Sequence, residues 1–118
     1  MERLSLEAYL LAKPGAAVDT PFGPGVFVYK VAGKMFALHG EPVRGVSLKC
    51  DPYLSEILRG EHSAITTGYH LDKRHWISVA FDGSLDDDFV HGLIDQSYDL
   101  VRAKLTRAQK AALEASPN

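Results

Sequence analysis

Hydrophobic and polar residues follow a strand-like pattern in short segments of the middle of the chain. The segments are rich in β-branched and aromatic residues, and they cover residues 26–31, 34–39, 45–50, 63–69 and 75–81. Ala32-Gly33 predicts a tight hairpin between the first two strands. The connections between consecutive strands are short, which favours an antiparallel sheet.

Other segments have apolar residues spaced three to four positions apart, which indicates helices. The first covers residues 5–13 and is ended by Pro14-Gly15. The second begins with Asp51 as N-cap and Pro52 in the first helical position, and we expect it to run to about Arg59 and to break at Gly60.

A long third helix is predicted near the end of the chain. Ser84 is the expected N-cap, and Asp87 three residues later completes an acidic capping box. The expected buried stripe of this helix consists of Val90, Ile94, Ser97, Val101 and Leu105. Residues 108–113 add a further turn or two, and residues 114–118 are expected to be a frayed end.

The elements therefore follow the order α-β-β-β-α-β-β-α in a single domain, residues 1–118. This order predicts an α+β fold of two layers, an antiparallel sheet of about five strands with helices on one face. Strand alternation directs Val46, Leu48 and Cys50 inward, so Cys50 should be buried and unreactive. The same alternation puts Lys49 and Trp76 on the opposite, half-open face.

Composition narrows the class of protein. Hydrophobic residues make up 46% of the chain and charged residues 24%, which is usual for a globular domain. The sequence has neither the roughly 18 consecutive apolar residues of a membrane span nor the pattern of a signal peptide. Cys50 is the sole cysteine, which excludes an internal disulfide and fits a reducing compartment. We expect a cytoplasmic protein that does not bind membranes.

Charge is distributed unevenly along the chain, although the net charge is only −2. Residues 82–99 carry six aspartates and no base, and residues 100–118 carry a net of +3. Acids at the start of a helix and bases near its end are favoured by the helix dipole. The charges of these two segments are therefore explained by the predicted third helix and need no binding partner. Residues 26–50 carry four bases and one acid, a net of +3, which the helix dipole does not explain.

The sequence contains no recognisable arrangement of catalytic, metal-binding or cofactor-binding residues. The five histidines lack the spacing of metal ligands, and no serine lies in a nucleophile elbow. The glycine-rich residues 22–25 precede a strand, whereas a phosphate cradle requires a helix N-terminus. We therefore expect no enzyme activity, no catalytic residue, no metal and no cofactor.

One segment concentrates bases and aromatic rings within eight positions, and its members are Tyr69, His70, Lys73, Arg74, His75 and Trp76. Lysine and arginine contact phosphates, and aromatic rings stack on nucleobases or wedge between them. The same pattern also fits a structural corner in which the rings fill the core and the charges are solvated. The residues alone leave both interpretations open.

The chain resembles the MmcQ/YjbR family. The matching pieces follow in order along nearly the whole chain: AKPGA (12–16), PFGPG (21–25), KVAGKMFAL (30–38), LKCDP (48–52), GYHLDKRHWISV (68–79) and LIDQSYDLVRAKL (93–105). Thr67 stands where the family commonly has proline, and Asp72 stands where asparagine is usual. The resemblance implies a two-layer α+β fold related to secretion-chaperone-like and frataxin-like domains.

The family is commonly labelled DNA-binding, with hairpins described as a double wing. Carried onto this chain, the resemblance implies DNA contacts from Lys34, Lys49 and the segment from Tyr69 to Trp76. The leading hypothesis is a non-enzymatic protein that contacts the phosphates of double-stranded DNA. The alternative is a protein-interaction or chaperone-like module that binds a protein partner through Trp76 and the open sheet face.

Overall fold

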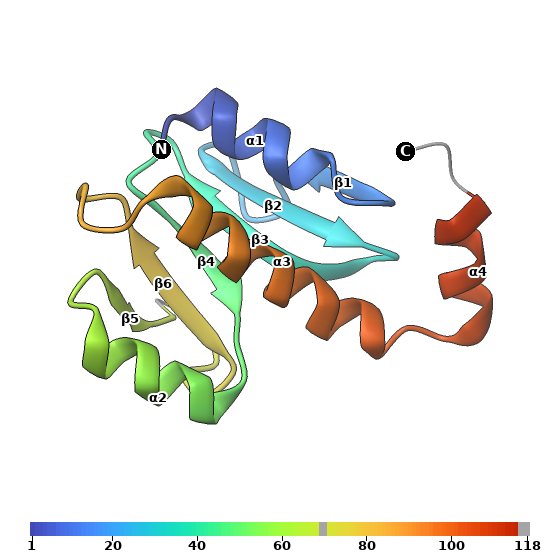
Figure 1. The fold of residues 1–118 in the computed structure, drawn as a ribbon. Helices are drawn as coiled ribbons and strands as arrows, with labels where there is room; N and C mark the ends of the chain where they lie inside the picture. The colour runs from blue at the N-terminus through green and yellow to red at the C-terminus, as the bar shows by residue number, and fades with distance from the viewer. Residues whose placement is uncertain (69–70, 116–118) are drawn as a thin grey trace.

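The computed structural model describes residues 1–68 and 71–115. In these residues the helices are α1 (Arg3–Leu11), α2 (Pro52–Glu61), α3 (Asp87–Ala103) and α4 (Arg107–Ala115). The strands are β1 (Ala16–Asp19), β2 (Val26–Val31), β3 (Lys34–Gly40), β4 (Gly45–Lys49), β5 (Ile65–Thr67) and β6 (Trp76–Ala80). They form an open antiparallel sheet in the order β1-β2-β3-β4-β6-β5 (Figure 1). The predicted α+β class is confirmed.

The sheet described here has six strands where the sequence predicts about five. The additional strand, β1, lacks the alternation of hydrophobic and polar residues that predicts the others. Its residues run antiparallel to β2, from Ala16 opposite Val31 to Asp19 opposite Val28. The side chains of β1 are half-exposed or exposed on both faces. A strand at the sheet edge that buries neither face carries no hydrophobic alternation, so only its pairing with β2 defines it.

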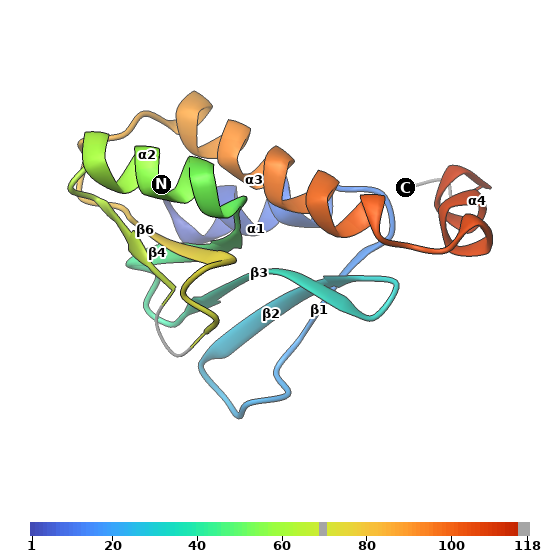
Figure 2. The ribbon, with the colours of Figure 1, turned by 90° about the horizontal axis from the view of Figure 1, so that it is seen from below.

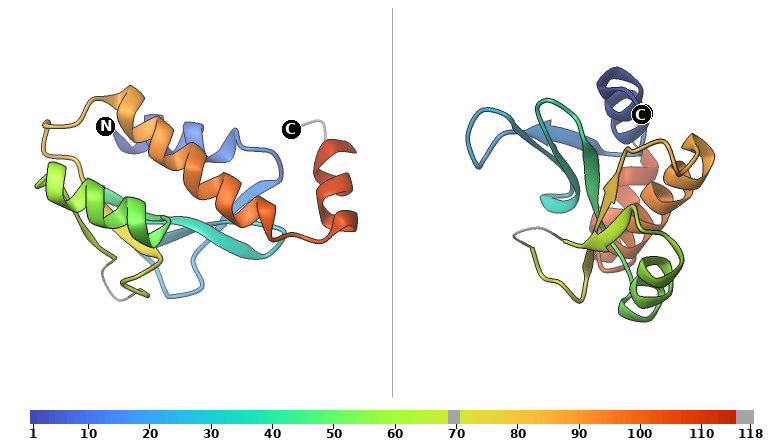
Figure 3. Two further views of the ribbon diagram at one scale, coloured as in Figure 1. Left: turned by 60° about the horizontal axis from the view of Figure 1, so that its bottom comes forward. Right: turned by 90° about the vertical axis from the view of Figure 1, so that its left-hand side faces the viewer.

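Helices α1, α2 and α3 lie on one side of the sheet, and the β1–β2 connection projects on the other side (Figures 2 and 3). The core lies between these layers. Its largest fully buried side chains include Tyr29, Phe36, Leu6, Leu10, Leu48, Ile77 and Ile94. All residues of the predicted stripe are buried, together with Leu93 and Tyr98, although the last of them, Leu105, lies just beyond the end of α3. None of the helices in the described residues is long and apolar enough to cross a membrane.

The start of α3 differs from the prediction that Ser84 is its N-cap. The N-cap is Asp86, whose side chain accepts a hydrogen bond from the Phe89 amide at 2.8 Å. Ser84 instead donates its hydroxyl and its amide to the Asp82 carboxylate, at 2.6 and 2.9 Å. The Asp82-Gly83 turn therefore uses Ser84, and the helix begins two residues later than a Ser84 cap requires.

Other boundaries shift by a few residues. Helix α2 starts as predicted, with Asp51 as N-cap and Pro52 first, but it continues through Gly60 to Glu61. Glycine inside a helix costs about 1 kcal/mol relative to alanine, which weakens a helix without ending it. Helix α1 covers Arg3–Leu11 instead of residues 5–13.

Cys50 is buried, with 5% of its surface exposed, as the alternation of its strand predicts. Burial raises the pKa of its thiol, and the nearby Asp51 carboxylate raises it further. A protonated, buried thiol is a poor nucleophile. The burial is confirmed, and the low reactivity of Cys50 stays a prediction.

Candidate nucleic-acid interface

The loop that precedes β6 is held in a tight turn by Asp72. Its carboxylate accepts hydrogen bonds from the Arg74 amide at 2.9 Å and from Nδ1 of His75 at 2.8 Å. Its carbonyl accepts from the amides of His75 and Trp76, at 3.2 and 3.0 Å. The hydrogen bond from His75 is the main reason why the pKa of Asp72 is lowered. The turn fixes the backbone and leaves Lys73 and Arg74 exposed.

This turn lies against the start of α2. The carbonyl of His75 accepts a hydrogen bond from the Cys50 amide at 2.9 Å. The next residue, Asp51, caps α2 by accepting from the amides of Tyr53 and Leu54, at 3.0 and 3.1 Å. Residues 48–54 run from β4 through the Asp51 cap into α2. The hydrogen bond between Cys50 and His75 therefore holds the 72–75 turn beside the N-terminus of α2.

Two shallow depressions flank this junction, and Pro52 lines both of them. One, of about 230 Å³, is lined by Lys49, His75 and Lys104, among others. The other, of about 330 Å³, is lined by Lys73, Arg74 and Arg59, among others. We call these bases together the basic surface: Lys49, Arg59, Lys73, Arg74, His75 and Lys104. They come from β4, α2, the turn and the segment after α3.

The lysines and arginines of the basic surface form no ion pairs with the carboxylates of the described residues. Within residues 1–68 and 71–115 none of the five has a carboxylate oxygen within 4.0 Å of a side-chain nitrogen. Elsewhere, Arg3, Lys13, Lys30 and Arg102 all form such pairs. Three carboxylates lie nearby: Asp51 and Glu56 line the depressions, and Asp72 lies in the turn itself, so five lysines and arginines face three acids. The surface therefore carries a local excess of positive charge.

The structure brings only some of the predicted contact residues together. Lys49, Lys73, Arg74 and His75 all belong to the basic surface. Lys34 is exposed at the tip of the β2–β3 hairpin, opposite Val31, and lines neither depression. Tyr69 and His70 lie outside the described residues.

Trp76 corrects the expectation of an exposed aromatic ring. It lies on the predicted face, opposite Lys49 in the β4–β6 ladder, but only 7% of its surface is exposed. Gly68, just after β5, lies directly beside it: its amide donates to the Trp76 carbonyl at 2.9 Å, and a Cβ added to Gly68 would come within 2.6 Å of the Trp76 Cβ. Alternation gives the face of a side chain but not what covers that face. Trp76 is therefore not available to a partner.

Arg59 and Lys104 belong to the basic surface although sequence reasoning did not select them. Each lies near the C-terminal end of a helix, where a positive charge is favoured by the helix dipole. The dipole alone accounts for a base at such a position, so nothing in the sequence marks either residue as a contact residue. Only the packing of α2 and α3 beside the turn reveals that they converge. Their sequence positions are separated from Lys73 by 14 and 31 residues, as the numbering shows.

The positive segment 26–50 does not form one surface. Lys30 is paired with Asp19 at 3.6 Å. Arg44 precedes β4 and Lys49 ends it, so the two lie at opposite ends of this strand, roughly 17 Å apart at about 3.3 Å per residue. The charge that the sequence counts together is thus divided between distant places.

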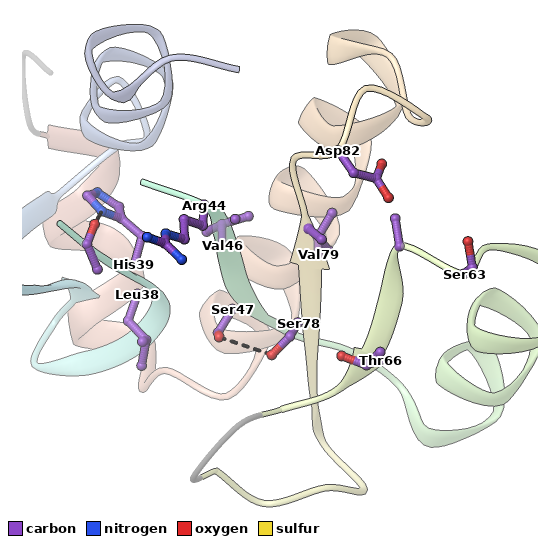
Figure 4. Close-up of a pocket in the computed structure, with 14 residues that line it drawn as sticks. Leu38, His39, Arg44, Val46, Ser47, Ser63, Thr66, Ser78, Val79 and Asp82 are labelled. Atoms are coloured by element: carbon purple, nitrogen blue, oxygen red, sulfur yellow. Dashed lines mark hydrogen bonds between the residues drawn. The ribbon is translucent and has the colours of Figure 1, made fainter. Parts of the chain in front are cut away.

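The open face of the sheet carries a separate hollow of about 390 Å³ (Figure 4). The strand register sets small and hydroxylated side chains in rows across it. Ser47 lies opposite Ser78, with the two hydroxyls 3.4 Å apart, and Thr66 of β5 pairs with Ser78 on the other side. Gly45 lies opposite Ala80 in the next row. The charged members of the lining are Arg44 and Asp82, so the hollow is close to neutral.

Metal ligands do not converge in the part of the chain that the structure describes. There, no three histidine, cysteine, aspartate or glutamate side chains are placed to hold an ion.

The fold and the site together define an α+β protein whose described residues form a six-stranded open sheet, with an excess of basic side chains at one junction of sheet and helix. The YjbR family model matches residues 11–100, and the chain belongs to this family.

Relatives of this chain include uncharacterized proteins of two bacteria. Protein YjbR of Escherichia coli (strain K12) is 40% identical over 92 residues, which cover 76% of this chain and 78% of the relative. Protein YbdF of Escherichia coli O157:H7 is 38% identical over 103 residues, covering 85% and 80%. Protein YyaQ of Bacillus subtilis (strain 168) is 39% identical over 64 residues, covering 54% and 52%.

Solved structures show the same fold. The crystal structure of Deinococcus radiodurans protein DR2400, a DUF419 domain, matches with a TM-score of 0.89 and 32% identity, covering 96% of this chain and 88% of that one. The crystal structure of a protein from Pseudomonas syringae matches with a TM-score of 0.73 and 28% identity, covering 85% and 98%.

Proposed function

We propose that this protein is a non-enzymatic DNA-binding protein of the cytoplasm, whose basic surface contacts the phosphates of the double helix. The observation that carries the proposal is the gathering of five lysine and arginine side chains, free of ion pairs to the described carboxylates, around one turn. Such side chains supply the sequence-independent part of DNA affinity by releasing counterions from the phosphates.

The rigid turn supports this role. The Asp72 cap holds the backbone amide of Arg74, so the exposed bases project from a fixed frame. A preorganised donor loses less conformational freedom when it binds. The net charge of −2 opposes long-range attraction to DNA. We therefore expect weak, largely non-specific binding, with a Kd of about 10⁻⁴–10⁻⁶ M at physiological salt.

The salt dependence of duplex binding tests the proposal. Replacing Lys73 and Arg74 together with alanine removes two phosphate contacts, so the slope of log K against log salt concentration should become shallower by roughly 1.8, at about 0.9 per contact. Asp72→Asn should strengthen binding slightly, because it removes a negative charge beside the phosphate. Fluorescence anisotropy of a labelled duplex at several salt concentrations measures each slope.

The matched control replaces Lys30 and Arg44 with alanine, which changes the net charge equally but away from the basic surface. Its slope should equal that of the wild type. Absence of duplex binding at low salt, or an unchanged slope in the Lys73/Arg74 variant, would rule out this function for the turn.

A second candidate function is a protein-interaction or chaperone-like module that uses the hollow on the open sheet face. The observation in its favour is the neutral lining of small and hydroxylated side chains around Ser47 and Ser78 (Figure 4). Backbone groups of an extended peptide segment suit such a lining. Ser78→Arg would fill the hollow and leave the basic surface intact, so the two candidates are separable by one substitution.

A further inference from the structure

Among the described residues, Tyr53 is the one large aromatic side chain that borders the basic surface and is almost fully exposed. Its surface is 80% exposed, and it lines the same depression as Arg59, Lys73 and Arg74. Trp76, the aromatic residue that the sequence offers for stacking, is buried. Among the described residues, an aromatic ring beside these bases is therefore supplied by α2 and not by β6.

The backbone of Tyr53 is fixed at the start of α2. Its amide donates to the Asp51 carboxylate at 3.0 Å, and Pro52 precedes it in the first helical position. Further along the helix, Nε of Arg59 donates to the hydroxyl of the buried Ser55 at 3.2 Å, which orients the guanidinium. The ring and its cationic neighbour are thus mounted on one rigid element.

We propose, on the basis of the function proposed above, that this site binds a single-stranded or unpaired segment of nucleic acid, with Tyr53 stacking on an exposed base. Lys73, Arg74 and Arg59 contact the phosphates that flank this base. A base inside a duplex is stacked on both faces and paired along its edge, so the ring can stack only where a face of a base is free. Glu56 in the same depression opposes phosphates and limits affinity.

The charges select nucleic acid over an apolar protein partner as the occupant. Three cations and one carboxylate line the depression around the ring, and stacking rings set among bases are the recurrent design of single-strand binding surfaces. Arginine and lysine supply the phosphate contacts, and the tyrosine face accepts any base. Little sequence preference is therefore expected.

The test compares three labelled ligands of equal strand charge: a DNA oligothymidylate of about 12 nucleotides, an abasic strand of the same length, and its RNA counterpart, oligouridylate. A duplex is titrated in parallel. The wild type should bind both base-bearing single strands about tenfold more tightly than the abasic strand, within the range measured for stacking on one base. Tyr53→Leu should lose this tenfold preference, and Tyr53→Phe should keep it.

The control is Ile57→Ala, which removes an apolar side chain that is 56% exposed on the same helix but lies outside the depression. It should behave like the wild type. A Tyr53→Leu variant that retains the preference for base-bearing strands overturns the inference, as does a wild type without that preference that still binds duplex. If the wild type binds neither duplex nor single strands, the proposed function fails as well.

Discussion

Ser97 shows how one polar residue in the core supports the site. It is fully buried on α3, donates its hydroxyl to the carbonyl of Phe36 in β3, and accepts from the amide of Lys49 in β4 at 2.9 Å. The strand pairing between β3 and β4 covers only Ala37 with Leu48 and Leu38 with Ser47. The hydroxyl therefore satisfies backbone groups where the ladder has ended, directly beside the basic surface.

Replacing Ser97 with alanine should lower the free energy of unfolding by about 2 kcal/mol, because it leaves a buried carbonyl and a buried amide without partners. Chemical denaturation measures the loss. Ser55→Ala is the matched control: this serine is equally buried in a helix, but its partner Arg59 can turn to water. Equal losses in the two variants would mean that the bridge between β3 and β4 adds nothing.

Residue-level patterns predict burial better than they predict exposure. The inward direction of Cys50 and the stripe of α3 follow from periodicity and are confirmed. Trp76 has the predicted face but not the predicted exposure, since only 7% of its surface is exposed. Alternation assigns a side chain to a face of the sheet, and no local pattern around Trp76 reports how much of that face is covered.

At the scale of elements, helix caps depend on competition between neighbouring acceptors. Both Ser84 and Asp86 are good N-cap residues by type, and the capping-box spacing to Asp87 favoured Ser84 in the sequence. In the structure Gly83 has a positive φ of 86°, which closes the turn from Asp82 and commits Ser84 to the Asp82 carboxylate. Asp86 is then the first residue free to cap α3.

This assignment predicts different effects for the two substitutions. Asp86→Ala should cost about 1 kcal/mol of stability through loss of the cap. Ser84→Ala should cost clearly less, because its hydroxyl bond is exposed and lies in the turn. Thermal or denaturant unfolding of both variants gives the comparison. A larger loss of stability for Ser84→Ala than for Asp86→Ala would mean that Ser84 is the N-cap of α3.

Most elements were predictable because their own residues carry the signal. The Ala32-Gly33 hairpin, the Asp51-Pro52 helix start and five of the strands follow from local chemistry. Strand β1 was not, since its stability comes from pairing with β2 and not from burial of its own side chains. The residues that stabilise β1 therefore belong to the partner strand β2, and the sequence of β1 itself does not predict a strand.

At the scale of the whole molecule, charge along the sequence and charge on the surface are different quantities. The net of +3 in residues 26–50 is dispersed, whereas the basic surface assembles from four separate segments. Half of the predicted contact residues, Lys49, Lys73, Arg74 and His75, lie on this surface. Arg59, Lys104 and Tyr53 join it only through the packing of α2 and α3, which no local pattern encodes.

We propose that nucleic acid binds at the basic surface and not in the hollow of the open sheet face. Two-dimensional ¹H–¹⁵N NMR spectra, recorded while DNA is added at low salt, test it most directly. We expect the largest amide shift changes in residues 49–51, 53–54 and 71–76, with smaller changes near Arg59 and Lys104; Pro52 has no amide proton. Changes confined to residues 45–47, 64–66 and 78–80, or no change at all, would contradict it.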